Sequence, residues 1–233
     1  NTEFYGEHLL HMENTKDKAV ILAKFAAEFS GAKSARVISR IKTPESMTKK
    51  IQSDGLPVNC ESALSVESDA IGVRIIVDSI SDVYAIFDNI KNIKALDDKT
   101  GCRVLNVKDF IRNPKPSGYR SLHVIIEIPI FLQNEKRYMK VEVQLRTIAM
   151  DFWASVEHKL RYKKNIPDSE AETLAVELSS YEDQLAELDN KMEQIKKRIV
   201  EAEKQAEPAG ERKRPITTIG STIIKNRLNG LIK

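Results

Sequence analysis

The chain has 233 residues, 41% of them hydrophobic and 30% charged, which fits a folded globular protein of one or two domains and excludes a disordered or fibrous chain. Two cysteines, Cys60 and Cys102, are too few for a disulfide scaffold or a zinc site of cysteine ligands. The net charge is +3, but residues 208–233 hold six Lys or Arg against one acidic residue, which leaves the rest near −2 and argues against a surface built to bind nucleic-acid backbones. No apolar run approaches the roughly 18 residues of a membrane span, so we expect a cytoplasmic protein.

Hydrophobic periodicity predicts a mixture of helices and strands over the first 162 residues. One or two helices are expected over 7–29, and single helices over 44–53, 81–93 and 147–162. The expected strands span 35–42, 71–77, 102–107, 121–128 and 137–146, the last two joined as a hairpin by a turn at 133–135. Gly31 is the expected stop of the first helix, and Thr43 and Pro44 are the expected N-cap and first position of the second.

From Ser169 onwards the pattern changes to heptads. Ser169 and Glu172 form a capping-box motif, which predicts the start of a helix that runs to about residue 206. Eight large side chains then alternate spacings of four and three: Leu174, Leu178, Tyr181, Leu185, Leu188, Met192, Ile195 and Ile199. Such a helix would be about 55 Å long and would overhang a body about 40 Å across. Its apolar seam must therefore meet another helix, and a partner chain is preferred to a hairpin return.

The segment after the heptads reads as a linker at 208–215 and a basic amphipathic stretch at 216–233. Packing onto a subunit surface is the preferred role of this stretch, with contact to a membrane or to nucleic acid as the alternatives.

The strand predicted at 71–77 carries charge where a buried strand normally excludes it. Asp69 stands just before this strand and Arg74 lies within it, so the two form either a structural ion pair or part of a ligand site. On the strand predicted at 137–146, alternation places four polar side chains on one face: Lys140, Glu142, Gln144 and Arg146. If Asp69 and Glu142 converge, two carboxylates become available for Mg²⁺, and Glu142 could also act as a general base.

The loop before the hairpin has the features of a nucleotide cradle. Two prolines and Gly118 make it rigid and permit a close approach, and Tyr119 offers a planar face on which a base could stack. Three further side chains could bind phosphates: Lys115, Arg120 and His123. Arg40 and Lys42 lie two apart on one strand and point the same way, which also favours a polyphosphate ligand. No P-loop and no dinucleotide-binding glycine motif occurs.

Taken in order, the polar motifs resemble those of one family. They are Arg40-x-Lys42 with Ser46 and Lys50, Asp69-x-x-Gly72-x-Arg74, Lys115 to His123, Glu142 to Thr147, and Trp153-x-x-x-Glu157-His158. This set is similar to the synthetase domain of RelA/SpoT-type alarmone synthetases over about residues 20–165. Because no hydrolase or regulatory domain accompanies the motifs, the chain resembles the small, single-domain members.

The resemblance implies an α+β fold of the nucleotidyltransferase type, a mixed β-sheet flanked by helices, with the long heptad helix behind it. We accordingly divide the chain into a catalytic domain at 1–167, an oligomerisation helix at 168–207 and a basic tail at 208–233. The implied activity is that of a GTP diphosphokinase, which moves the β,γ-pyrophosphate of ATP to the 3′-hydroxyl of GTP or GDP and makes (p)ppGpp, the alarmone of the stringent response. The implied partners are ATP, GTP or GDP, Mg²⁺, and other copies of the chain in a homotetramer.

The resemblance also implies roles for the matching residues. Adenine would lie between Arg40 and Arg74, and the ATP phosphates would be held by Lys42, Ser46 and Lys50. Guanine would stack on Tyr119, and the acceptor's other contacts would come from Lys115, His123, Gln144, Arg146 and Asp151. Mg²⁺ would be bound by Asp69 and Glu142, and Glu142 would also activate the 3′-hydroxyl.

Two departures from the family pattern concern the acceptor. Residues 106–109 match the family's R-x-K-D segment only at Lys108 and Asp109, and Asp151 stands where several members have Asn. The choice between GTP and GDP therefore stays open, as does regulation by RNA or (p)ppGpp.

Two other functions remain as alternatives. The first is a toxin-like pyrophosphokinase of the tRNA 3′ end, which the nearly neutral body disfavours although the basic tail could serve RNA. The second is a catalytically silent nucleotide- or RNA-binding regulator, which the presence of Asp69 and Glu142 disfavours.

Overall fold

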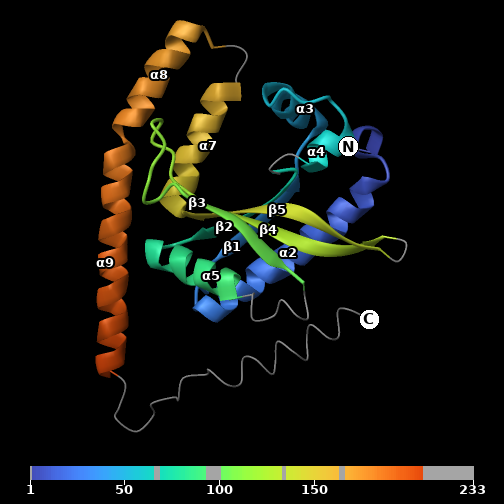
Figure 1. Ribbon diagram of the computed structural model, residues 1–233. Coiled ribbons are helices and arrows are strands. Elements are labelled where there is room, and N and C mark those ends of the chain that lie inside the picture. Colours follow the sequence, from blue (N-terminus) through green and yellow to red (C-terminus); the bar gives the residue numbers. More distant parts are fainter. Residues whose placement is uncertain (1, 66–68, 93–100, 133–134, 163–165, 207–233) are drawn as a thin grey trace. The chain divides into compact units, whose positions relative to one another are not determined.

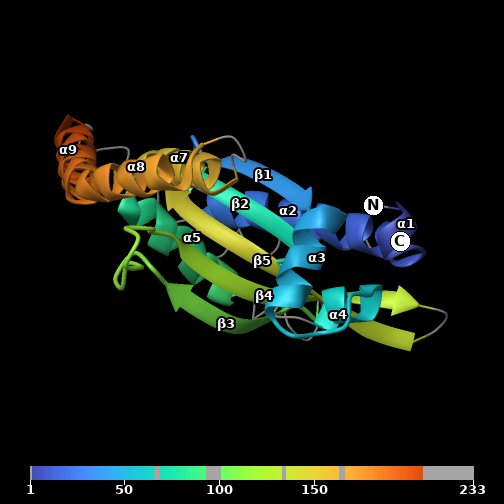
Figure 2. The ribbon, with the colours of Figure 1, turned by 90° about the horizontal axis from the view of Figure 1, so that it is seen from above.

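The structure, a computed structural model, describes residues 2–65, 69–92, 101–132, 135–162 and 166–206. The chain divides into two compact units, Asn1–Gln194 and Ile195–Lys233. In the first unit, the described residues form a mixed five-stranded sheet with helices on both faces (Figures 1 and 2). The predicted tail at 208–233 lies outside the described residues, and the division of the chain at 167 and 207 stays a prediction.

The described elements follow the expected order. The helices are α1 (Thr2–Tyr5), α2 (His8–Ser30), α3 (Pro44–Ser53), α4 (Cys60–Ser65), α5 (Ile80–Asn92), α7 (Ile148–Tyr162), α8 (Asp168–Ser180) and α9 (Glu182–Ala206). The strands are β1 (Arg36–Ile41), β2 (Ile71–Val77), β3 (Arg103–Asp109), β4 (Leu122–Leu132) and β5 (Glu135–Thr147). The helices and strands expected over the first 162 residues are thus confirmed, whereas the short helices α1 and α4 were not expected. Most of the predicted hairpin turn lies outside the described residues. Within the described residues, no helix is both long and apolar enough to cross a membrane.

The sheet has the strand order β1-β2-β5-β4-β3, in which β2 and β5 are parallel and the other neighbours antiparallel. Residues directly opposite one another in neighbouring strands share a face of the sheet. Arg40 lies opposite Gly72, and Gly72 lies opposite Glu142. In the next row of this face, Arg74 lies opposite Gln144, which lies opposite His123. Register alone therefore gathers polar residues from four strands on one face.

The two faces of the sheet differ in chemistry, as the alternation along β5 predicts. One face is apolar and packs against α2 and α5, while α3 and α7 lie on the polar side (Figure 1). The buried residues of the apolar face include Val73, Ile75, Val124, Val141, Val143 and Leu145. At roughly 1.5–3 kcal/mol for each fully buried large aliphatic side chain, this layer stabilises the sheet and leaves the opposite face available for polar groups.

Two local predictions at chain turns are confirmed. Gly31 ends α2 in the left-handed region, with φ 79°, and its N–H donates to the carbonyl oxygens of Ala27 and Glu28. Thr43 caps α3, because its side chain accepts a hydrogen bond of 3.4 Å from the Ser46 N–H, and Pro44 occupies the first turn.

The C-terminal helix differs from the prediction in two ways. Its N-cap is Pro167, and Ser169 lies inside α8, so the proposed capping box is wrong. The helix is also interrupted at Tyr181, where the N–H donates to the Leu178 carbonyl three residues back and tightens the last turn of α8. Heptad spacing continues through this bend and therefore could not reveal it. The bend sets the direction in which α9 leaves.

Candidate active site

One end of the polar face gathers two lysines around an aspartate. Lys42 follows β1, Lys50 lies on α3 and Asp69 precedes β2. The Lys42 ammonium forms an ion pair with Asp69 Oδ2, and Lys50 Nζ lies 3.2 Å from Oδ1. Ser46 lies in the first turn of α3 and shares two hydrogen bonds with Thr43. A helix N-terminus beside two lysines is suited to bind phosphate groups.

A cavity of about 110 Å³ lies on the polar face between this cluster and β5. The predicted site residues that line it are Arg40, Asp69, Gly72, Arg74, Glu142 and Gln144. Arg40 lies across Gly72, since a Cβ on that glycine would come 3.7 Å from Arg40 Cγ. Burial, together with the charges of Arg40 and Arg74, lowers the pKa of His158. The cavity therefore carries both arginine and carboxylate charges, and the two arginines act on His158.

Seven side chains form a closed ring of hydrogen bonds and ion pairs on the polar face, in the order Glu142, His123, Tyr119, Arg146, Asp151, Arg74 and Gln144. The joined atoms lie 2.5–3.3 Å apart. Asp151 accepts from Arg74 and from Arg146 through the same oxygen, Oδ1. Residues predicted for ATP and for the acceptor therefore belong to one network, and Asp151, from α7, joins them.

Glu142 is an ionised carboxylate within this ring. Burial by itself would raise the pKa of Glu142, but the hydrogen bond and charge of His123, the hydrogen bond from Gln144 and the charge of Lys50 lower it to about 2. His123 Nδ1 lies 2.8 Å from Glu142 Oε1, and Gln144 Nε2 donates to Oε2 at 2.7 Å. The carboxylate is therefore charged at neutral pH and held in one orientation.

Tyr119 stands at the exit of the proline-containing loop, between cations and other aromatic rings. Lys115 Nζ lies 5.0 Å and Arg146 Cζ 5.2 Å from its ring centroid. The rings of Phe110 and Trp153 meet it edge to face, at centroid distances of 6.1 and 6.4 Å. Tyr119 therefore lies among contacts that fix its ring, as a stacking platform requires.

The two carboxylates fit a magnesium ion better than a closed metal cage. Asp69 and Glu142 line the same cavity, and the two oxygens of Asp69 pair with Lys42 and Lys50 in the structure. Among the described residues, no group of three or more His, Cys, Asp or Glu side chains could hold a metal. Mg²⁺ commonly takes one or two carboxylates and completes its shell with water and substrate phosphates.

The structure brings together most of the residues predicted for the site. Lys42, Lys50 and Asp69 meet directly, and the remaining members share the cavity or the ring, apart from Lys115 beside Tyr119 and Ser46 on α3. Glu182, whose carboxylate oxygen lies 3.1 Å from Arg120 Nε, was not among the predicted residues. The two are 62 residues apart, and no local pattern signals the pair.

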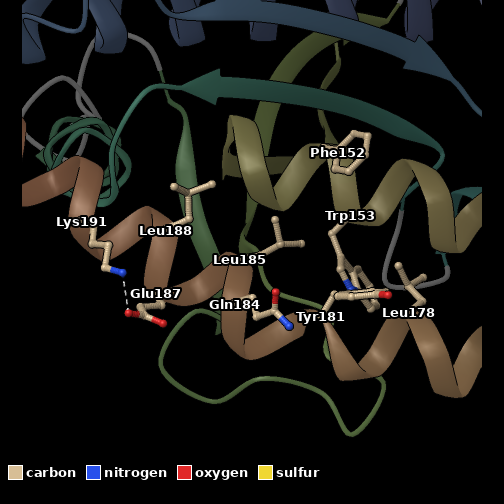
Figure 3. A pocket seen from close by; sticks show the side chains of 9 residues that line it. All are labelled: Phe152, Trp153, Leu178, Tyr181, Gln184, Leu185, Glu187, Leu188 and Lys191. Atoms are coloured by element: carbon tan, nitrogen blue, oxygen red, sulfur yellow. Dashed lines mark ion pairs between the residues drawn. The ribbon is translucent and has the colours of Figure 1, made fainter.

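A larger cavity of about 460 Å³ lies away from these residues, between α7 and the pair α8 and α9 (Figure 3). Most of its lining is apolar, including Phe152, Trp153, Leu178, Leu185 and Leu188. Several of these are heptad positions. This cavity therefore belongs to the helical seam and not to the polar site.

Comparison with known proteins identifies the family. A sequence model described as "Region found in RelA / SpoT proteins" matches residues 39–167. GTP pyrophosphokinase YwaC of Bacillus subtilis (strain 168) is 43% identical over 165 residues, which cover 69% of this chain and 73% of that protein. GTP pyrophosphokinase YjbM of the same organism is 30% identical over 169 residues, 72% of this chain and 74% of that protein.

Solved structures agree with this result. The crystal structure of small alarmone synthetase 2 from Bacillus subtilis matches with a TM-score of 0.65 and 36% identity, over 82% of this chain and 97% of that one. Small alarmone synthetase 1 from Bacillus subtilis, bound to its product pppGpp, matches with a TM-score of 0.69 and 23% identity, over 85% of this chain and 99% of that one. At this identity the match supports the fold alone. The family model covers more than half of the chain, and the chain therefore belongs to the RelA/SpoT family.

Proposed function

We propose that this chain is a GTP pyrophosphokinase that moves the β,γ-pyrophosphate of ATP to the 3′-hydroxyl of GTP or GDP and so makes (p)ppGpp. The observation that carries the proposal is a cavity on the polar face lined by two carboxylates and two arginines, with two lysines paired to one of the carboxylates, Asp69. Pyrophosphoryl transfer depends mainly on positioning and charge neutralisation, which this set can supply. The membership in the RelA/SpoT family points the same way.

On the donor side, Arg40 and Arg74 would hold adenine, and the phosphates would lie at the N-terminus of α3 with Ser46, Lys42 and Lys50. Both lysines pair with Asp69 in the structure. When they turn to the phosphates, the Asp69 carboxylate becomes available to a metal. Mg²⁺ held by Asp69 and Glu142 would neutralise charge that develops on the transferred group.

On the acceptor side, guanine would stack on Tyr119, and the other contacts would come from Lys115, His123, Gln144, Arg146 and Asp151. Glu142 would accept a hydrogen bond from the 3′-hydroxyl and orient it. Glu142 is ionised, so it can accept the proton as the hydroxyl oxygen bonds to the β-phosphorus and AMP leaves. In a loose transition state this proton transfer need not be advanced, and positioning and charge contribute most.

The function is tested by label transfer. The full chain is incubated with γ-³²P-ATP and Mg²⁺ and offered GDP, GTP or deacylated tRNA in parallel. We expect label on a guanosine nucleotide, its loss in Glu142→Gln, and its retention in the matched control Glu170→Gln, because Glu170 is exposed on α8. Label on tRNA alone would instead identify a tRNA pyrophosphokinase, and no label on any acceptor would identify a silent regulator.

We further propose that the chain forms a homo-oligomer, a tetramer as its family resemblance implies, through the exposed side of its C-terminal helices. Four heptad positions on α9 are 44–53% exposed: Leu188, Met192, Ile195 and Ile199. Such a stripe of large apolar side chains is unfavourable in water and is suited to pair with another helix. The cavity shown in Figure 3 is lined by Leu188 of this stripe and by Phe152, which is also exposed. The cytoplasm, where ATP and guanosine nucleotides are available, is the compartment we propose.

A further inference from the structure

Three acidic side chains of α9 contact residues that lie before α8 in the chain. Glu182, Asp189 and Glu193 are seven and four residues apart, so they lie along one side of the helix. Arg120 donates to Glu182 from Nε at 3.1 Å, Thr147 donates to Asp189 at 2.7 Å, and the Ser81 N–H donates to Glu193 at 3.0 Å. These are specific, directional contacts.

The first of these contacts lies against the loop that carries Tyr119. Arg120 follows Tyr119, and Gly118 precedes it. A Cβ on Gly118 would lie 2.9 Å from Glu182 Oε2 and 3.2 Å from Glu182 Cβ, so a larger residue here would require the Glu182 side chain to shift. The φ of +84° at Gly118 independently favours glycine. The Glu182 side chain therefore contacts both neighbours of Tyr119.

The loop itself is closed by short hydrogen bonds. The Gly118 N–H donates to the Lys115 carbonyl at 2.8 Å, and the Lys115 N–H donates to the Tyr119 carbonyl at 3.2 Å. A loop closed in this way moves as a unit, so a contact at Gly118 and Arg120 also fixes the Tyr119 ring. The Arg120–Glu182 ion pair is suited to this task because its side chains are only 24% and 21% exposed, and water screens it less than a surface pair.

We propose that Glu182 is a positioning residue for the acceptor nucleotide: from α9, it holds Gly118 and Arg120 and thereby fixes the ring of Tyr119. The inference rests on the proposed function for its consequence in catalysis, but not for the positioning itself. The ion pairs of the donor cluster join Lys42 and Lys50 to Asp69 and do not include Glu182.

The first test is kinetic and uses the full chain. Glu182→Gln keeps the size of the side chain and removes its charge, and Glu193→Gln makes the same change on the same helix face away from the loop. We expect Glu182→Gln to raise KM for the guanosine acceptor by about threefold to tenfold, as weakening of one partly buried ion pair predicts, with KM for ATP unchanged. Equal effects of the two variants, or a rise confined to KM for ATP, would overturn the proposal.

The second test is independent of activity. Hydrogen exchange of the backbone amides over 115–121 should be faster in Glu182→Gln than in the unaltered chain and in Glu193→Gln. Arg120→Gln should have the same effect, and the double variant should be no worse than either single one, since both remove one interaction. Unchanged exchange in Glu182→Gln would overturn the positioning role. A chain that lacks transferase activity but shows the expected exchange would refute the proposed function and leave the positioning intact.

Discussion

Tyr119 and His123 share a hydrogen bond of 2.8 Å between the phenol oxygen and Nε2. His123 Nδ1 in turn lies 2.8 Å from Glu142, so the proposed base platform is joined to the proposed reaction centre through one imidazole. Arg146 donates to the Tyr119 hydroxyl at 2.5 Å, so the same chain of contacts also reaches Arg146.

This relationship predicts a shift in pH dependence on removal of His123. In His123→Leu, burial of Glu142 is no longer offset by the imidazole, so the pKa of Glu142 should rise from about 2. The acid limb of the kcat/KM profile should move to higher pH, since activity needs the ionised carboxylate. Profiles of both proteins over the acid range measure this, and an unmoved acid limb would contradict the assigned cause.

The same carboxylate should contribute to stability in a defined pH window. A carboxyl with a lowered pKa in the folded state stabilises the fold above its ordinary value of 4.5, and the contribution is lost as pH falls towards 2. Denaturant unfolding should therefore show a smaller loss of stability in Glu142→Gln than in the unaltered chain between about pH 5 and pH 3. Parallel losses in the two proteins would argue against the lowered pKa.

Buried Asp189 should make the stability of the fold depend on pH in the opposite direction. Burial raises its pKa, and the hydrogen bond from Thr147 and the charge of Arg120 offset this only in part. The folded state then holds this proton more tightly than the unfolded state, so stability falls as pH rises above 3.8, the ordinary value. Asp189→Asn should lack this component, and comparison of unfolding free energies between about pH 4 and pH 7 checks it. An identical slope in both proteins would show that Asp189 keeps its ordinary pKa.

Tyr119 should affect the acceptor and not the donor. Tyr119→Ala removes the ring, and base–aromatic stacking contributes about 1–3 kcal/mol, so KM for the guanosine acceptor should rise by about fivefold or more. Tyr119→Phe keeps the ring but loses the hydrogen bonds to His123 and Arg146, and should have a smaller effect. Initial rates with each nucleotide varied separately measure this, and equal effects on ATP would rule out the assignment.

The exposed seam of α9 should control assembly. Ile195→Asp and Ile199→Asp place charge on side chains that are 47% and 53% exposed, so the fold should tolerate them. We expect the double variant to have a smaller mass by light scattering, with an unchanged circular-dichroism spectrum. Glu203→Gln, on the same helix, provides the control. An unchanged mass of the double variant would show that another surface joins the copies, or that the chain is monomeric if the unaltered protein has the mass of one chain.

Local sequence patterns determined the elements of this protein. Apolar periodicity specified β2 and α2, Gly31 ended a helix because it adopts a left-handed conformation, and Thr43 with Pro44 began another. Alternation along β5 placed Glu142, Gln144 and Arg146 on one face. These are short-range effects that depend only on backbone geometry and neighbouring residues, and so they are readable in the chain.

Only the tertiary structure decided which polar residues meet. The pairing of Lys42 and Lys50 with Asp69, the ring through Asp151, and the contact of Glu182 with the Tyr119 loop join segments far apart in sequence. The bend at Tyr181 is also invisible in the heptads, because a change in backbone direction leaves side-chain spacing intact. Sheet register and helix direction fix these contacts, and both result from packing of the whole domain.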